Sequence, residues 1–160
     1  MEVYVFGEAH SSFMDIRRVW KRIKQIKPKV IMHELLYDDH VKDRVDIRSR
    51  IRDCKVGGVC DPRLNLDVYQ LGYELDAELI GIDTDTDALT INDRIRQREA
   101  HMIEKIKEFI HLEGPVVIVV GDLHLRDKSI GLLEGGSKLY DYLKPFAKSI
   151  ERSPIHLREA

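Results

Sequence analysis

The chain has 160 residues and a formal net charge of -2, with 43% hydrophobic and 34% charged residues. A chain of this length suits one compact domain with one core, and its slightly acidic balance gives no reason to expect a nucleic-acid partner. No apolar run approaches the ~20 residues that cross a bilayer, and the first residues enter a strand without a basic and apolar leader. We therefore expect a cytoplasmic protein with no membrane partner, whose oligomeric state the sequence leaves open.

Strands and helices alternate along the chain. Four buried strands are predicted from short runs rich in β-branched residues, at 3–6, 30–33, 79–82 and 116–120. Helical patterns separate them at 15–27, from 62 to about 75, at about 91–112 and, as one helix or a pair, within 127–143. The alternation predicts an α/β fold: a single compact domain over 1–160, with a mostly parallel central sheet of about four to five strands and helices on both faces. An edge strand is expected at 148–152.

The first predicted helix has an apolar side and a basic side. Apolar residues recur at helical spacing, namely Ile16, Val19, Trp20, Ile23 and Ile26. The basic residues are Arg17, Arg18, Lys21, Arg22 and Lys24. We interpret the basic run as solvated helix surface, with phosphate binding as the alternative.

The segment 37–61 fits the alternation least, because it is dense in charge and poor in apolar residues. We expect a charged helical excursion or a flap over the edge of the sheet. Cys54 and Cys60 lie within it on either side of Gly57-Gly58. Two reduced thiols are the expected state in the cytoplasm, and a small disulfide is the alternative.

Acids and histidines follow all four buried strands. Because the carboxyl ends of parallel strands share one edge of a sheet, ligands bind there in open α/β folds. Glycine at two of these ends lets the backbone turn and lets another group come close. The residues that follow the strands are Gly7-Glu8-Ala9-His10, His33-Glu34, the aspartates 83, 85 and 87, and Gly121-Asp122-Leu123-His124.

The same arrangement of glycine, acid and histidine occurs twice, which favours a shared site for His10 and His124. Imidazoles and carboxylates from separate strands make a mixed nitrogen and oxygen site for a divalent metal. The predicted ligands are His10, His124, Glu8, Glu34 and Asp122. We interpret Asp85 and Asp87 as helix caps, whereas Asp83 fits a cap and a site equally well.

A guanidinium interrupts the apolar stripe of the long predicted helix. Arg98 falls in the middle of the stripe, whose apolar members are Ile91, Ile95, Met102, Ile106 and Phe109. A charge on the core side needs a partner, because burying an unpaired charge is very costly. We expect Arg98 to pair with strand-end carboxylates and to stabilise negative charge that develops on a substrate. A structural buried salt bridge is the alternative.

The other five histidines are predicted to lie outside the site. His33 should point to the opposite sheet face from its neighbour at 34, as a packed or capping residue. His101 is expected to be partly exposed, and His40, His111 and His156 are interpreted as surface residues.

These residues in this order resemble a known group. Two G-x-x-H motifs, one near each end of the domain, are similar to those of the TraB/Tiki group, within the fold superfamily of erythromycin-esterase-like and ChaN-like proteins. The matching residues, between 3 and about 143, are Gly7-Glu8-Ala9-His10, Glu34, Arg98 and Gly121-Asp122-Leu123-His124. The resemblance implies divalent-metal-dependent hydrolysis of peptide or ester bonds, or haem and iron binding as in ChaN-like members. It implies a functional set of Glu8, His10, Glu34, Arg98 and His124.

The leading hypothesis is a metal-dependent hydrolase of a small-molecule or peptide substrate, with Mn, Co or Zn as the metal. The metal would lower the pKa of its bound water to about 7. Glu8 or Glu34 would act as general base, and Arg98 would stabilise the oxyanion. A metal-free variant, in which a histidine or glutamate activates water directly, fits the same residues. The alternatives are a non-catalytic metal- or haem-binding module of the ChaN-like type and, from G-D-L-H-L at 121–125, a phosphoesterase.

Overall fold

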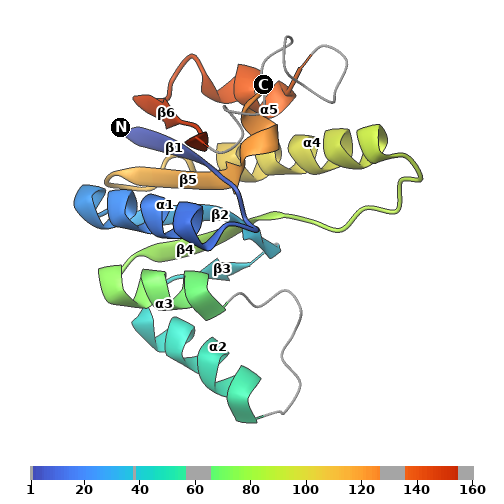
Figure 1. The fold of residues 1–160 in the computed structure, drawn as a ribbon. Helices are drawn as coiled ribbons and strands as arrows, with labels where there is room; N and C mark the ends of the chain where they lie inside the picture. Colours follow the sequence, from blue (N-terminus) through green and yellow to red (C-terminus); the bar gives the residue numbers. More distant parts are fainter. Residues whose placement is uncertain (1, 38, 57–65, 127–135, 155–160) are drawn as a thin grey trace.

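The computed structural model describes residues 2–37, 39–56, 66–126 and 136–154, in which six strands form one sheet and five α-helices pack on it (Figure 1). The strands are β1 (Val3–Glu8), β2 (Val30–Tyr37), β3 (His40–Val41), β4 (Glu78–Asp83), β5 (Val116–Gly121) and β6 (Ser149–Glu151). The helices are α1 (Phe13–Ile26), α2 (Arg44–Val56), α3 (Leu66–Leu75), α4 (Ile91–Phe109) and α5 (Lys138–Leu143). A short 3-10 helix, η1 (Asp122–Leu125), follows β5. The predicted single α/β domain is thus confirmed in its class, with more strands than expected.

The strand order is β3-β4-β2-β5-β1-β6. All neighbouring strands are parallel except β3, which pairs antiparallel with β4. β5 therefore lies between β1 and β2, and in the register Glu8 lies opposite Gly121. The chain leaves β1 and β2 on either side of the end of β5, which is the position where ligands bind in folds of this class.

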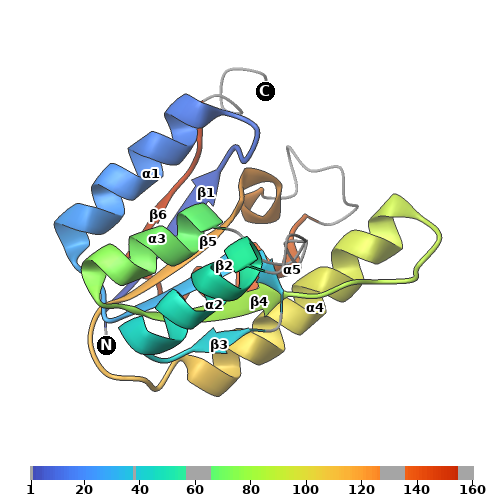
Figure 2. The same ribbon diagram turned by 90° about the horizontal axis from the view of Figure 1, so that it is seen from below.

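Helices cover both faces of the sheet, as the sequence predicts. The apolar run of β5 explains why: Val116, Ile118 and Val120 belong to one core, and Val117 and Val119 belong to the other. The first core includes side chains of α4 and α5, and the second includes side chains of α1, α2 and α3. These two groups of helices lie on opposite faces of the sheet (Figure 2). A strand that is buried on both faces can be apolar at every position.

The segment 37–61 contributes an edge strand and a helix, in the part that the structure describes. β3 adds two residues to the sheet, and α2 packs onto the second core through Ile47, which is fully buried. The side chains of Cys54 and Cys60 lie outside the described residues, as do most of the predicted helix pair (127–135) and His156. Across the described residues, no helix combines the length and apolar character that crossing a bilayer demands.

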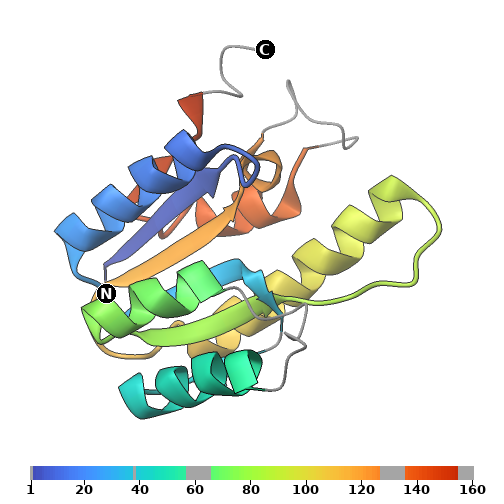
Figure 3. The same ribbon diagram turned by 60° about the horizontal axis from the view of Figure 1, so that its bottom comes forward.

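The longest helix begins away from the sheet. β4 continues into an extended connection, and the first turns of α4 reach beyond the sheet edge before the helix crosses the face (Figure 3). Thr90 is the N-cap, because its side chain accepts a hydrogen bond from the Asp93 N–H at 3.1 Å. Capping of this kind satisfies an amide that the helix leaves without a partner.

Candidate active site

Glu34 lies at the centre of a cluster of charged side chains at the carboxyl edge of the sheet. It is 5% exposed. Its Oε1 accepts hydrogen bonds from Arg98 Nη2 at 2.8 Å and from His124 Nε2 at 3.2 Å. Its Oε2 accepts from His10 Nε2 at 3.3 Å and from the backbone N–H of Gly121. One carboxylate from β2 thus joins an arginine from α4 to two histidines that follow β1 and β5.

His10 is the imidazole of the cluster that solvent reaches, since its side chain is 27% exposed. Its Nδ1 lies 2.9 Å from Glu8 Oε1, so a carboxylate contacts each ring nitrogen. Glu8 ends β1 and is buried, and its Oε2 has no hydrogen-bond partner among the described residues. A buried acceptor without a partner destabilises the fold, because it has lost its hydrogen bonds to water without gaining a donor from the protein.

His124 is held by a residue that the sequence analysis missed. Its Nδ1 lies 2.6 Å from Oε2 of Glu99, a buried residue of α4. The same oxygen accepts from Ser137 Oγ at 2.9 Å, and Glu99 Oε1 accepts from the Leu139 N–H at 3.2 Å. A signal for this role was present, because Glu99 precedes Met102 by three residues and so shares its apolar side of the helix.

Arg98 is anchored by a second carboxylate. Its Nε donates to Asp83 Oδ1 at 2.9 Å, and its Nη2 donates to Asp83 Oδ2 at 2.7 Å, in the paired geometry that guanidinium and carboxylate groups favour. Asp83 is 1% exposed, at the end of β4. Of the two readings that the sequence allowed for Asp83, a helix cap and a site residue, the geometry corresponds to the second.

Asp122, a predicted metal ligand, is not brought into the cluster. Its Oδ2 accepts from Arg152 Nη2 at 2.8 Å, and its Oδ1 accepts from the Ser153 N–H at 2.7 Å. A Cβ at position 7 would lie 2.5 Å from Asp122 Oδ1, so Gly7 makes room for it. Asp122 therefore fastens the chain after β6 to the end of β5. Its side chain is taken up by these contacts and is not directed at the histidines.

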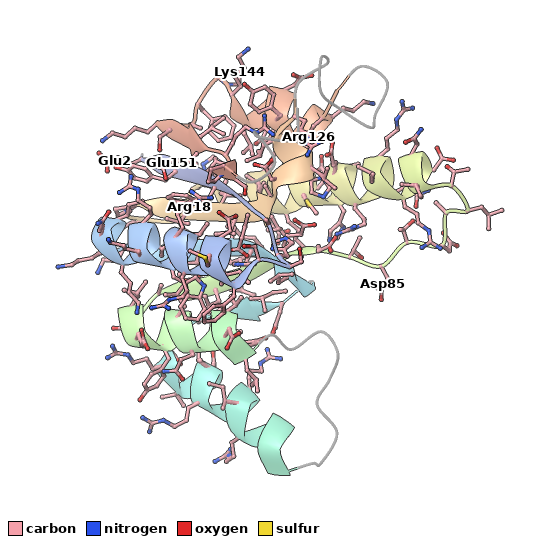
Figure 4. All side chains as sticks on the ribbon, viewed as in Figure 1. Glu2, Arg18, Asp85, Arg126, Lys144 and Glu151 are labelled. Carbon is pink, nitrogen blue, oxygen red and sulfur yellow. The ribbon has the colours of Figure 1, made fainter. Side chains whose placement is uncertain are left out.

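The two aspartates on the connection to α4 lie apart from the cluster. Asp85 and Asp87 are exposed, and Figure 4 shows Asp85 pointing away from the sheet. Neither caps α4, since that position belongs to Thr90. The predicted capping role of these residues is therefore wrong, and the reason is that the extended connection runs on past them before the helix begins.

His33 packs beside the cluster without joining it. Its Nδ1 accepts the Leu35 N–H at 3.1 Å, and its ring centroid lies 6.3 Å from that of His10. Burial lowers the pKa of His33 to about 4, so this imidazole is neutral at physiological pH.

Hydrogen bonds and charge interactions together outweigh burial in setting the charges of the cluster. Burial alone would lower the pKa of His10, but the carboxylates of Glu34 and Glu8 raise it to about 9. Burial would likewise lower the pKa of His124, and Glu34 and Glu99 raise it to about 9. Burial acts to raise the pKa of Glu34, but its bonds to both histidines hold it well below the usual range. At neutral pH the cluster is therefore a carboxylate between two imidazolium ions.

Gly121 allows these groups to meet. A Cβ at this position would lie 3.2 Å from Glu34 Oε2 and 3.4 Å from His10 Nε2. Any side chain would therefore crowd the contact between carboxylate and imidazole. The backbone N–H of the same residue donates to Glu34, so the end of β5 both makes space and supplies a donor.

The cluster as arranged does not fit the Mn, Co or Zn site that the sequence predicts. A metal needs an imidazole nitrogen whose lone pair points at the ion. Both nitrogens of His10 and of His124 contact carboxylates instead. Within the described ranges, no group of three or more metal-ligating side chains is placed to hold an ion. We therefore derive no chemical step through a metal.

The fold matches solved structures of bacterial toxins. No family model matches the chain, and no curated protein matches its sequence. Among the solved structures that match are two described as bacterial protein toxins, with TM-scores of 0.60 and 0.58 and identities of 15% and 14%. A third is RRSP, a MARTX toxin effector domain from Vibrio vulnificus CMCP6, with a TM-score of 0.57 and 16% identity. They cover 97%, 95% and 97% of this chain, which spans 34% of each of theirs.

These matches correct the predicted family. The solved structures that share this fold are described as toxins and a toxin effector domain, and not as TraB/Tiki, erythromycin-esterase-like or ChaN-like proteins. The metal-dependent hydrolase of that type is therefore not supported, nor are the ChaN-like module and the phosphoesterase. A G-x-x-H motif fixes only two positions, and it marks a strand end at which the backbone turns. The glycine of such a motif fits any strand end at which the backbone turns, so the motif does not identify a family.

Proposed function

We propose that this chain is an effector-type enzyme domain that cleaves its substrate with water, by general acid–base catalysis that needs no metal ion. The observation that carries the proposal is the hydrogen bonding of His10, His124 and Arg98 to the single carboxylate of Glu34. Two proton-carrying imidazoles and a fixed cation within one cluster are the groups that acid–base chemistry on a carbonyl requires. The fold of toxin effector domains supports the effector role.

His10 would carry the proton. It is partly exposed, so a substrate can reach it, and its Nδ1 contacts the buried carboxylate of Glu8 at 2.9 Å. The carboxylate on Nδ1 fixes the orientation of the ring. The other nitrogen, Nε2, would exchange its 3.3 Å contact with Glu34 for a contact with the attacking water. In its neutral form His10 would take a proton from water and then deliver it to the leaving group.

Arg98 would stabilise the negative charge that appears when water adds to a carbonyl, and the buried positive charge of His124 would add to the electrostatic attraction there. Arg98 is fixed by Asp83, and its side chain is 28% exposed. His124 is fixed by Glu99 and stays protonated at neutral pH. Positive groups that are already in place require no rearrangement during the reaction.

Glu34 is the wrong residue for the general base in this arrangement, although the sequence analysis named it as one candidate. Its two oxygens accept from four donors, and its pKa is held well below the usual range. A carboxylate so stabilised has little tendency to take up a proton. We assign it the task of holding the cationic groups together.

The pH dependence of the reaction should have a maximum near pH 9. His10 must lose its proton to act as base, and its pKa is about 9, so kcat/KM rises about tenfold per pH unit below that value. His124 must keep its proton, and its pKa is also about 9, so kcat/KM falls at higher pH. Measuring kcat/KM from about pH 6 to 10.5 checks this, and a flat profile between pH 6 and 8 would contradict it.

A search for cleavage products tests the proposed function. Protein treated with EDTA is incubated with a peptide library made from a digested proteome and with a panel of simple esters, and new termini or free acids are measured by mass spectrometry. We expect turnover by the wild type in EDTA. Turnover that appears only after Mn, Co or Zn is added, or no turnover in any condition, would overturn the proposal.

Glu99 should act as a positioning residue. In Glu99→Gln, the charge that holds His124 is lost while the shape is kept, so we expect kcat to fall about tenfold to a hundredfold with KM little changed. The contacts of Glu99 with Ser137 and with the Leu139 N–H should also weaken, which lowers the free energy of unfolding by about 1–3 kcal/mol. Steady-state kinetics and urea unfolding measure the two effects.

The matched control for this variant is Glu104→Gln, also on α4. The side chain of Glu104 is 74% exposed, and it forms a surface pair with Lys107. We expect both kcat and stability to stay near their wild-type values. If the two variants behaved alike, Glu99 would have no positioning role.

A further inference from the structure

The outward side of α1 is basic and contains no acid. At about 100° per residue, its exposed positions fall within roughly one third of the circumference of the helix. They are Phe13, Met14, Arg17, Lys21, Lys24 and Gln25. The chain as a whole has a net charge of -2, so this basic side is a local feature.

The cations in the middle of this side have no partner of opposite charge in the part of the chain that the structure describes. Arg17 and Lys21 form no ion pair with any described residue, whereas Lys24, Arg18 and Arg22 each contact a carboxylate. Arg18 turns from the helix toward the strands, where it also donates to a backbone carbonyl of β1 (Figure 4). The pattern separates cations that hold the fold together from cations that face outward.

Two large apolar side chains lie at the first turn of the same helix. Phe13 is 71% exposed and Met14 is 81% exposed. The guanidinium of Arg17 lies 5.6 Å from the Phe13 ring centroid, so cation and apolar groups are adjacent. Beside them runs a groove of about 690 Å³, lined by residues of α1 that include Trp20. Exposed apolar groups of this size next to cations are typical of a contact surface.

We propose that this side of α1 docks on an anionic lipid bilayer. The cations would contact the headgroups, and Phe13 and Met14 would enter the boundary with the acyl chains, as in helices that lie in the membrane interface. A nucleic-acid backbone would use the cations but has no place for a phenyl and a thioether side chain. The sequence predicted no membrane partner because no segment is long enough to cross a bilayer, and peripheral docking needs no such segment.

Docking in this way would place the candidate active site beside the bilayer, since Phe13 follows His10 by three residues. The inference does not depend on the proposed function, because it uses residues outside the cluster. It can therefore be tested by binding alone.

Sedimentation with vesicles tests the inference on the full chain. Vesicles of phosphatidylcholine alone are compared with vesicles that also contain phosphatidylserine, at low and at high salt. We expect binding only to the anionic vesicles, and weaker binding at high salt. Arg17→Gln with Lys21→Gln should weaken binding roughly thirtyfold, at about fivefold per cation. A separate variant, Phe13→Ser with Met14→Ser, should also weaken binding to the anionic vesicles, although it leaves the net charge unchanged.

Lys105→Gln with Lys107→Gln is the matched control, because it removes the same charge from α4 on the other face of the sheet. This pair should bind as the wild type does, and circular dichroism shows that each variant is folded. Three results would overturn the inference: no binding to the anionic vesicles, equal losses in the control pair, or binding to a DNA duplex as tight as to lipid and unaffected by the Phe13 and Met14 changes. The last would indicate a general polyanion surface.

Discussion

Replacing Glu34 with Gln should lower the free energy of unfolding by about 3–5 kcal/mol, the cost of breaking a buried ion pair by removing one partner. The amide keeps the size of the side chain but not its charge, so Arg98 and two imidazolium groups lose the carboxylate that they share. Asp83, Glu8 and Glu99 would each still bind one of these cations, which limits the loss of free energy of unfolding. Urea unfolding followed by circular dichroism measures the effect.

Glu151→Gln provides the comparison for Glu34→Gln. Glu151 also binds a guanidinium, that of Arg22 at 2.8 Å, but the two side chains are 31% and 39% exposed. Solvent screens such a pair, so we expect a change of about 1 kcal/mol or less. A Glu34→Gln variant as stable as this one would show that Glu34 does not hold the cluster together.

Replacing His10 with Ala should lower kcat by about 10²–10⁴-fold, the usual contribution of a general acid or base. The side chain is partly exposed, so its removal leaves a site that water can fill, and the fold should remain. The expected signature is therefore loss of turnover with a largely preserved unfolding transition. Kinetics and urea unfolding on the same preparation separate the two.

His40→Ala is the control for this variant, because the two histidines have similar surroundings. The side chain of His40 is 30% exposed and contacts Glu78 Oε2 at 2.6 Å, at the far edge of the sheet on β3. We expect turnover to be unchanged in His40→Ala. Equal turnover in both variants would remove His10 from the mechanism.

The fold class and the location of the site at the carboxyl edge of the sheet could be predicted from the sequence, because both follow from local patterns. The run of apolar residues at 116–120 is typical of a strand buried on two faces, and the alternation of strands with helices predicts a parallel sheet. Parallel strands share a carboxyl edge, so His10, Glu34 and His124 were expected at one place. β3 was missed because a two-residue strand has no periodicity to detect.

The pairing of side chains within the site could not be predicted in the same way. Asp122 follows β5 just as Glu8 follows β1, yet Asp122 is taken up by Arg152 and Ser153, residues of the chain after β6. Only the folded chain brings these partners together. Glu99 was not predicted for a different reason, since the neighbouring Arg98 also places a charge on the apolar side of the helix.

The family prediction failed for a physical reason as well. The residues used for it are those that a parallel sheet places at its carboxyl edge, whatever the ancestry of the chain. The structures that share the fold are 14% to 16% identical to this chain, so the similarity lies in the course of the backbone and not in the sequence. The chemistry of the cluster therefore has to be argued from its own contacts.

The most direct test of this account is the ionisation of His10 and His124, measured by NMR on protein with ¹⁵N-labelled imidazoles and assigned with single histidine variants. We predict that both rings are doubly protonated at pH 7 and titrate with pKa values of about 9, and that both values fall in Glu34→Gln, in which Glu8 and Glu99 remain. Rings that are neutral at pH 7 in the wild type, or values that do not change in the variant, would contradict the central claim that one carboxylate holds two imidazolium ions in place.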